Sequence, residues 1–288
     1  MVRLRACLLL TFFIVAVPHA FSIDLTTAFS IGNGGFSKDP LLSELAPVWG
    51  FMSGISFKAN ENISVSGELF RDDLAGNMMN SRLIYTNSYF QISIGPSFAA
   101  FNNKDRRLKP GINSSISVRK EGLIGFTASF YTTLGGFSDR ESDYVQKRTN
   151  LSLDLNIPGA LCTFSFNSGF FSRYGTYSSY LSLTKDIESV YKLEADLYKE
   201  GIPFDLLISL GYKNNKRLYP TNDAEGRDKA SYGHLFFGVG TSIRIGEKLV
   251  LRAMIENSLY SLSLSESLPP ESIPAYLFKV DTEVVYRF

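Results

Sequence analysis

The sequence has few of the residues on which disulfide, metal and redox chemistry depend. It contains two cysteines and two histidines in 288 residues. Cys7 and His19 lie in a segment that we interpret below as a cleaved leader, so only Cys162 and His234 remain in the mature chain. One cysteine cannot form an intramolecular disulfide. One cysteine and one histidine together supply fewer ligands than a zinc site needs. We therefore expect no disulfide, no transition-metal site and no cofactor.

Long apolar runs are also missing. After residue 22, no apolar run approaches the ~20 residues that a membrane-spanning helix requires. This excludes a helical membrane protein.

Neither sign of charge dominates the chain. Of 29 basic residues, Arg3 and Arg5 leave with the leader, so 27 remain against 28 acidic ones. A nucleic-acid-binding surface needs concentrated positive charge. We expect no nucleic-acid partner.

The amino-terminal segment has the layout of a secretory signal peptide. Arg3 and Arg5 precede an apolar core over residues 8–17, and small residues stand at −3 and −1 from the bond between Ser22 and Ile23. This pattern predicts a signal peptide over residues 1–22, cleaved between Ser22 and Ile23. Residues 23–288 then form one domain.

Aromatic residues are abundant, with 23 Phe and 15 Tyr in the full chain. Short alternating segments are abundant in residues 23–288. Apolar residues occupy every second position in several segments: 23–31, 90–100, 151–157, 235–245 and 276–288. Period-two alternation is typical of strands with one apolar face. Strands can cross a bilayer only in a closed barrel, where every backbone group is paired.

The connections between these segments are of two kinds. Short turns are predicted at 60–62, 87–88, 120–122, 157–159, 200–202 and 246–248. Longer polar stretches are predicted near 33–46, 72–78, 102–109, 135–147, 173–188, 214–230 and 261–273. Six turns and seven loops predict an all-β, transmembrane, antiparallel up-and-down β-barrel of about fourteen strands, with twelve or sixteen as alternatives. We interpret 173–188 as a strand extension or an external hairpin.

The last strand ends on an aromatic residue. Val284, Tyr286 and Phe288 lie at alternate positions, and the chain stops at Phe288. This ending resembles the terminal strand of bacterial outer-membrane β-barrels of the porin-like class. The resemblance implies that Val284, Tyr286 and Phe288 form a signal for the barrel assembly machinery, and that the mature chain lies in outer-membrane lipid.

Register places many charged residues on the face opposite the apolar one. This predicted lumen face carries Asp24, Glu68, Arg119, Asp154, Lys192, Glu194, Asp196, Asp205, Arg244, Arg252, Glu256, Lys279, Asp281, Glu283 and Arg287. A basic residue facing lipid near mid-membrane costs roughly 2–4 kcal/mol, so a charged face indicates water or paired partners. A fourteen-strand barrel is also too wide for side chains to fill. A pore is the simplest interpretation, and a plugged lumen is the alternative.

Both signs of charge occur on that face, which argues against steep ion selectivity. Glu194, Asp196 and Asp205 form an acidic group, and Arg244 and Arg252 form a basic one. Opposed acidic and basic walls would create a transverse field. Alternatively, these charges neutralise one another.

An enzymatic function is not expected. His234 is the only histidine available as a general base, and its register directs it into the lumen, away from lipid. We predict instead a monomeric outer-membrane channel for passive diffusion of small hydrophilic solutes, similar in size to monomeric fourteen-strand porins. A barrel like the long-chain fatty-acid transporters is one alternative, although alternation from Ile23 leaves no segment for their amino-terminal hatch. A non-transporting adhesive or structural barrel is the other.

Overall fold

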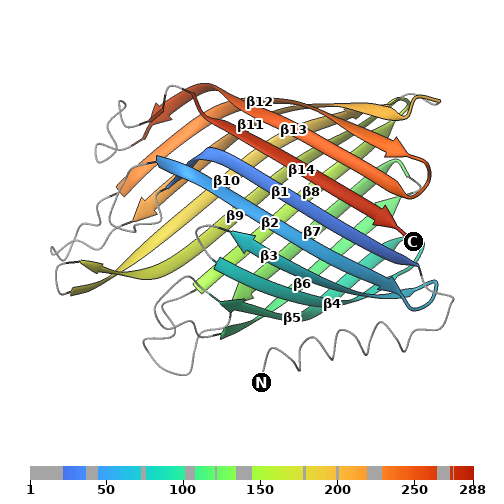
Figure 1. Cartoon of the computed structure of the whole chain (residues 1–288), viewed down its shortest axis with the longest axis horizontal. Coiled ribbons are helices and arrows are strands. Elements are labelled where there is room, and N and C mark those ends of the chain that lie inside the picture. Colours follow the sequence, from blue (N-terminus) through green and yellow to red (C-terminus); the bar gives the residue numbers. More distant parts are fainter. Residues whose placement is uncertain are drawn as a thin grey trace.

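The computed structural model is a closed β-barrel of fourteen strands (Figure 1). The strands are β1 (Ile23–Phe36), β2 (Leu45–Lys58), β3 (Ile63–Asp72), β4 (Gly76–Thr86), β5 (Phe90–Ala100), β6 (Leu108–Lys120), β7 (Ile124–Thr133), β8 (Val145–Ile157), β9 (Ala160–Tyr177), β10 (Tyr180–Leu197), β11 (Phe204–Leu218), β12 (Lys229–Ile245), β13 (Leu249–Ser263) and β14 (Phe278–Arg287).

The structure describes residues 22–36, 45–72, 76–100, 108–120, 122–133, 145–177, 180–198, 201–218, 229–264, 273–274 and 276–288. Apart from Ser22, the expected signal peptide lies outside these residues. Cleavage between Ser22 and Ile23 stays a prediction.

Each strand pairs antiparallel with its neighbours in sequence, and β1 closes the barrel by pairing with β14. The closing ladder runs from Asp24 opposite Arg287 to Gly32 opposite Lys279. The predicted up-and-down barrel is confirmed, with fourteen strands instead of twelve or sixteen. The described residues contain no helix that is long and apolar enough to cross a membrane.

The outer surface carries a belt of exposed apolar side chains, with contributions from every strand. One member from each strand, in order, is Phe29, Phe51, Leu69, Leu83, Ile94, Ile116, Phe126, Leu153, Phe164, Leu193, Leu210, Val239, Ile255 and Val284. Soluble proteins rarely expose so large a contiguous apolar surface, because its contact with water is unfavourable. The belt requires a lipid environment, so the barrel spans a membrane.

All six short connections lie at one end of the barrel, at the predicted positions; we call this the turn end. Two of the turns share one device. The Asn60 side-chain oxygen accepts hydrogen bonds from the amides of Asn62 and Ile63, at 2.9 and 2.8 Å, and the Asn87 oxygen does the same at 2.9 and 2.8 Å for Tyr89 and Phe90. Asparagine side chains stabilise tight turns in this way.

At the opposite end, which we call the loop end, the strands run further than the sequence predicts. β1 reaches Phe36 and β11 reaches Leu218, inside the loops predicted at 33–46 and 214–230. β9 and β10 have 18 residues each and pair up to Tyr177 and Tyr180, so 173–188 is an extension of these strands. The bounds predicted for the loops at 33–46 and 214–230 are therefore wrong, whereas the interpretation of 173–188 as a strand extension is confirmed. Strand ends beyond the lipid can be polar on both faces, so period-two alternation stops before the strand does.

The loop end of β1 bends into the barrel. Its register with β2 shifts between Gly32 and Gly35, and a Cβ at Gly35 would lie 2.3 Å from Val48 Cγ1. Phe36 then packs against Tyr232, with ring centroids 5.7 Å apart. They belong to an internal apolar cluster, the mouth cluster: Phe36, Ala230, Tyr232, Ile273 and Leu277. Gly32-Asn33-Gly34-Gly35 thus form an inward bend of β1, although the sequence predicts a loop from residue 33.

Candidate functional site

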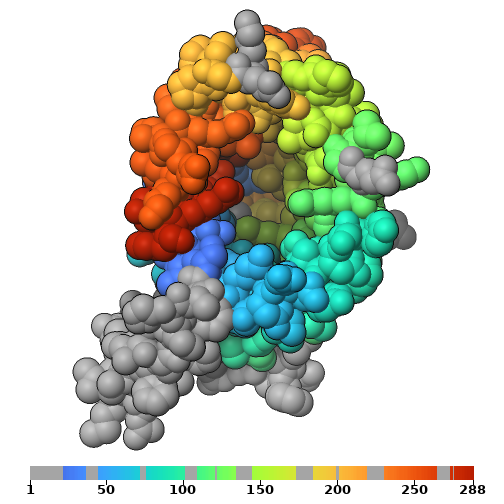
Figure 2. Space-filling view, turned by 90° about the vertical axis from the view of Figure 1, so that its right-hand side faces the viewer, coloured from blue at the N-terminus to red at the C-terminus, as the bar shows by residue number. Residues whose placement is uncertain are grey.

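The barrel is hollow. Figure 2, seen from the turn end, shows the strands as a ring around a deep recess. The described strands line two cavities in the interior. The outer chamber, towards the loop end, has a volume of about 680 Å³ and takes lining residues from every strand except β5. The inner chamber has a volume of about 370 Å³ and is lined from β1, β2, β3, β10, β13 and β14.

The predicted charged residues distribute over three levels. Glu68, Glu256 and Lys279 line the outer chamber. The inner chamber is lined by Lys192, Glu194, Arg252, Asp281 and Glu283. The remaining inward positions lie close to the turn-end limits of their strands: Asp24, Arg119, Asp154, Asp196, Asp205, Arg244 and Arg287.

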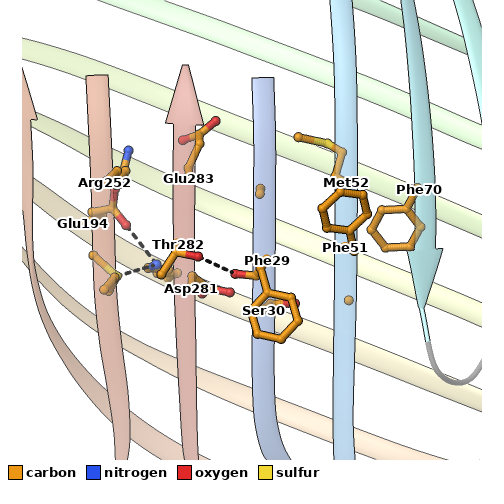
Figure 3. A pocket seen from close by; sticks show the side chains of 14 residues that line it. Phe29, Ser30, Phe51, Met52, Phe70, Glu194, Arg252, Asp281, Thr282 and Glu283 are labelled. Atoms are coloured by element: carbon orange, nitrogen blue, oxygen red, sulfur yellow. Dashed lines mark hydrogen bonds and ion pairs between the residues drawn. The ribbon is translucent and has the colours of Figure 1, made fainter. Parts of the chain in front are cut away.

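An ion-pair network joins β10 to β13 across the two intervening strands. Lys192 Nζ lies 2.8 Å from a Glu194 oxygen and 2.7 Å from a Glu256 oxygen, and Arg252 binds Glu194 (Figure 3). Gly238 on β12 makes room for it, because a Cβ there would lie 2.9 Å from Glu256 Cγ. The network covers the inner wall from β10 to β13.

The acidic and basic groups of the sequence analysis are therefore not opposed walls across water. Arg252 binds Glu194, and Arg244 Nη2 lies 2.6 Å from Asp205 Oδ2. The Arg244–Asp205 pair joins neighbouring strands, and the Arg252–Glu194 pair reaches across β11 and β12. These charges therefore neutralise one another, which was the alternative interpretation. Lys279 and Asp281 form a further pair at 2.7 Å.

A second set of charged residues, which the sequence analysis missed, lies nearer the loop end. Arg217 is fully buried and binds Asp186 twice, at 2.6 and 2.9 Å, while its guanidinium stands 4.7 Å from the Phe36 ring. Lys213 Nζ lies 2.7 Å from Glu188 Oε2. Asp186, Glu188 and Arg217 fall within or beside stretches that the sequence analysis assigned to loops, where register arguments do not apply.

Arg148 on β8 and Phe70 on β3 meet inside the barrel, although four strands separate β3 from β8 along the wall. The guanidinium carbon lies 4.6 Å from the ring centroid. Beside them, Arg82 binds Glu68 at 3.0 Å and Asn113 at 2.8 Å. Extending the alternation of Asp154 back by six residues places Arg148 on the inner face, but the alternating segment of the sequence begins only at Leu151.

His234 lies in the wall of the outer chamber, as its register predicts, between the rings of Tyr232 and Phe236, each 5.9 Å away. Its Nδ1 is buried without a hydrogen-bond partner among the described residues. A catalytic triad needs a carboxylate at that nitrogen. The described residues also hold no cluster of three His, Cys, Asp or Glu side chains suited to a metal. Cys162 follows the lipid-facing register.

The carboxy-terminal strand ends at the turn end, where the Phe288 amide donates a hydrogen bond to the Ile23 carbonyl at 2.9 Å. Val284 faces outward, and the Phe288 side chain is 61% exposed. Its ring packs edge-on against Tyr286, with centroids 4.7 Å apart. The ring of Phe288 therefore contributes little packing to the folded barrel.

Replacing Phe288 with alanine keeps this backbone hydrogen bond and removes only the ring. If Val284, Tyr286 and Phe288 are an assembly signal, Phe288→Ala should sharply reduce the protein inserted into the outer membrane of a Gram-negative host. Refolding of the purified variant into detergent micelles should change little. Fractionation of cells and a gel-shift refolding assay measure the two effects, and equal losses in both would indicate a purely structural role.

The closed wall, the apolar belt and the hollow polar interior define an outer-membrane β-barrel of the channel type. A solved bacterial polysaccharide outer-membrane secretin has the same fold, with a TM-score of 0.51, 11% identity, and 92% of this chain and 98% of that one covered. An outer-membrane channel from Pseudomonas putida F1 aligns with a TM-score of 0.48 and 9% identity over 95% and 97% of the two chains. Salmonella typhi OmpF aligns at 0.41 and 10% over 93% and 97%. No protein-family model matches the chain, and no curated protein sequence matches it.

Proposed function

We propose that the mature chain is a monomeric channel through which small hydrophilic solutes diffuse across the bacterial outer membrane, with its turn end towards the periplasm. The observation that carries this proposal is the wet interior. The side chains of Glu188, Lys279 and Arg244 face inward from different levels of the barrel and are 51%, 50% and 58% exposed. Charged side chains exposed inside a closed wall require water.

The pairing of the interior charges supports weak ion selectivity. Selective pores carry rings of one sign of charge. Each level of this lumen, by contrast, contains both acidic and basic side chains. Lys192, Arg244 and Arg252 each have a carboxylate partner. We expect anions and cations to pass with similar ease.

Planar-bilayer recording tests the proposal. Purified, folded protein should form ion-conducting channels in the bilayer. Vesicles that contain it should swell in solutions of small sugars but not in solutions of large oligosaccharides. Asn167→Trp places a large side chain in the outer chamber and should lower single-channel conductance. Phe166→Trp, at the preceding position on β9, enlarges a lipid-facing ring beside Tyr191 and is the matched control.

Absence of current from protein with full β-sheet circular dichroism would overturn the channel. It would favour the adhesive or structural barrel. Uptake of long-chain fatty acids without ion current would favour the fatty-acid-transporter-like alternative.

A further inference from the structure

The two chambers meet at one patch of the wall. Their lining residues overlap only at Ser30, Gly50, Met52 and Phe70, on β1, β2 and β3. Figure 3 shows Met52 and Phe70 on this side of the inner chamber, with Arg252 and Asp281 on neighbouring strands of the other side. A solute that moves directly from one chamber to the other therefore passes Phe70.

Arg148 narrows that junction from across the barrel. It lines the outer chamber, and its guanidinium reaches the face of the Phe70 ring, 4.6 Å from the centroid. The contact joins strands on different sides of the lumen, so it reduces the passage between the chambers. A guanidinium over an aromatic face is a favourable contact worth about 0.5–2 kcal/mol, so it holds Arg148 beside the Phe70 ring.

The two side chains offer complementary chemistry to such a solute. A planar aromatic ring can stack on Phe70, because offset-stacked rings attract each other. A guanidinium, in turn, is the side chain best suited to bind a carboxylate through parallel hydrogen bonds. The outer chamber, at about 680 Å³, has the volume of a small-molecule site.

We propose that the junction between the chambers is a binding site for small aromatic carboxylates, with the ring stacked on Phe70 and the carboxylate paired with Arg148. The proposal rests on the channel function proposed above in one respect only, namely that the solute reaches the junction through the lumen. It makes Phe70 and Arg148 the residues that determine solute preference.

Calorimetric titration of the folded barrel in detergent tests the site without reference to current. Benzoate is the probe, cyclohexanecarboxylate lacks the aromatic ring, and benzamide lacks the charge. Benzoate should bind more tightly than either. Phe70→Leu should weaken benzoate binding roughly 2- to 12-fold, the range of an aromatic pair, and leave cyclohexanecarboxylate binding unchanged. Arg148→Gln should remove the preference of benzoate over benzamide, and Arg148→Lys should restore part of it.

Matched controls separate the junction from general effects. Phe166→Leu removes a lipid-facing ring, and Arg244→Gln removes an inward-facing guanidinium at the turn end. Neither should change benzoate affinity. Equal binding of benzoate and cyclohexanecarboxylate, or an Arg148→Gln variant that still prefers benzoate, would overturn the site. Ion current with no benzoate binding would refute the site and leave the channel standing, whereas benzoate binding without current would refute the channel and keep the site.

Discussion

Arg217→Ala is expected to lower the free energy of unfolding of the barrel by about 3–5 kcal/mol, because it removes a buried cation that binds the Asp186 carboxylate twice. The Arg217 side chain is fully buried, and its two hydrogen bonds to Asp186 join β10 and β11 inside the loop end. The guanidinium also covers the Phe36 ring, so the mouth cluster loses a packing partner. Urea unfolding in lipid vesicles, followed through the fluorescence of Trp49, the single tryptophan, measures the loss.

Two comparisons make this result specific. Lys213→Ala removes the cation of a pair between the same two strands, but the Glu188 side chain of that pair is half exposed, so we expect a loss of about 0–1 kcal/mol. The double variant Asp186→Leu with Arg217→Met replaces the pair by apolar side chains and should recover much of the stability. Similar losses for Arg217→Ala and Lys213→Ala would contradict the assignment of a buried pair.

Leu151→Arg is expected to block most insertion of the barrel, whereas Asn150→Arg, at the adjacent position on β8, should be accommodated. Leu151 faces outward within the apolar belt, and a basic side chain facing lipid costs roughly 2–4 kcal/mol at the membrane centre. Asn150 points into the outer chamber, where an added guanidinium meets water and Asn167 opposite. Heat-modified gel mobility after refolding into vesicles measures the folded fraction of each variant.

The outcome depends only on which face each residue occupies. Leu151→Gln is the intermediate control, because it removes apolar surface without adding charge. If both arginine variants fold equally well, the strand register along β8 is wrong by one residue, since a shift by one exchanges the two faces.

The wall of the barrel could be predicted from the sequence because lipid and water impose opposite requirements on alternate residues. Leu235, Phe237 and Val239 alternate with His234 and Gly238, and the structure puts the first three outside. The six turns could be predicted as well, since asparagine and glycine favour tight turns through their own side-chain and backbone geometry, whatever the rest of the fold.

The interior could be predicted only in part. Register assigns a residue to the inner face, but it does not say which residues of distant strands meet there. Arg148 and Phe70 illustrate this limit, because their contact depends on the width and shape of the closed barrel. Gly240 illustrates another: an inward-facing glycine suggests free space, yet a Cβ there would lie 2.3 Å from the Ala253 carbonyl oxygen.

The pairing of β1 with β14 also has a consequence for how the chain folds. Every other pair of neighbouring strands is a hairpin between consecutive segments, which can form soon after both are available. The closing seam, by contrast, joins Asn33 to Tyr276 and Phe278, and the Asn33 amide group bonds to the backbone of both, across 243 residues of chain in the first case. Until the last strand arrives, the growing sheet carries two unpaired edges, which invite association with other chains. The risk of aggregation in this protein is therefore concentrated in the interval before closure, and anything that holds β1 during that interval protects the whole barrel.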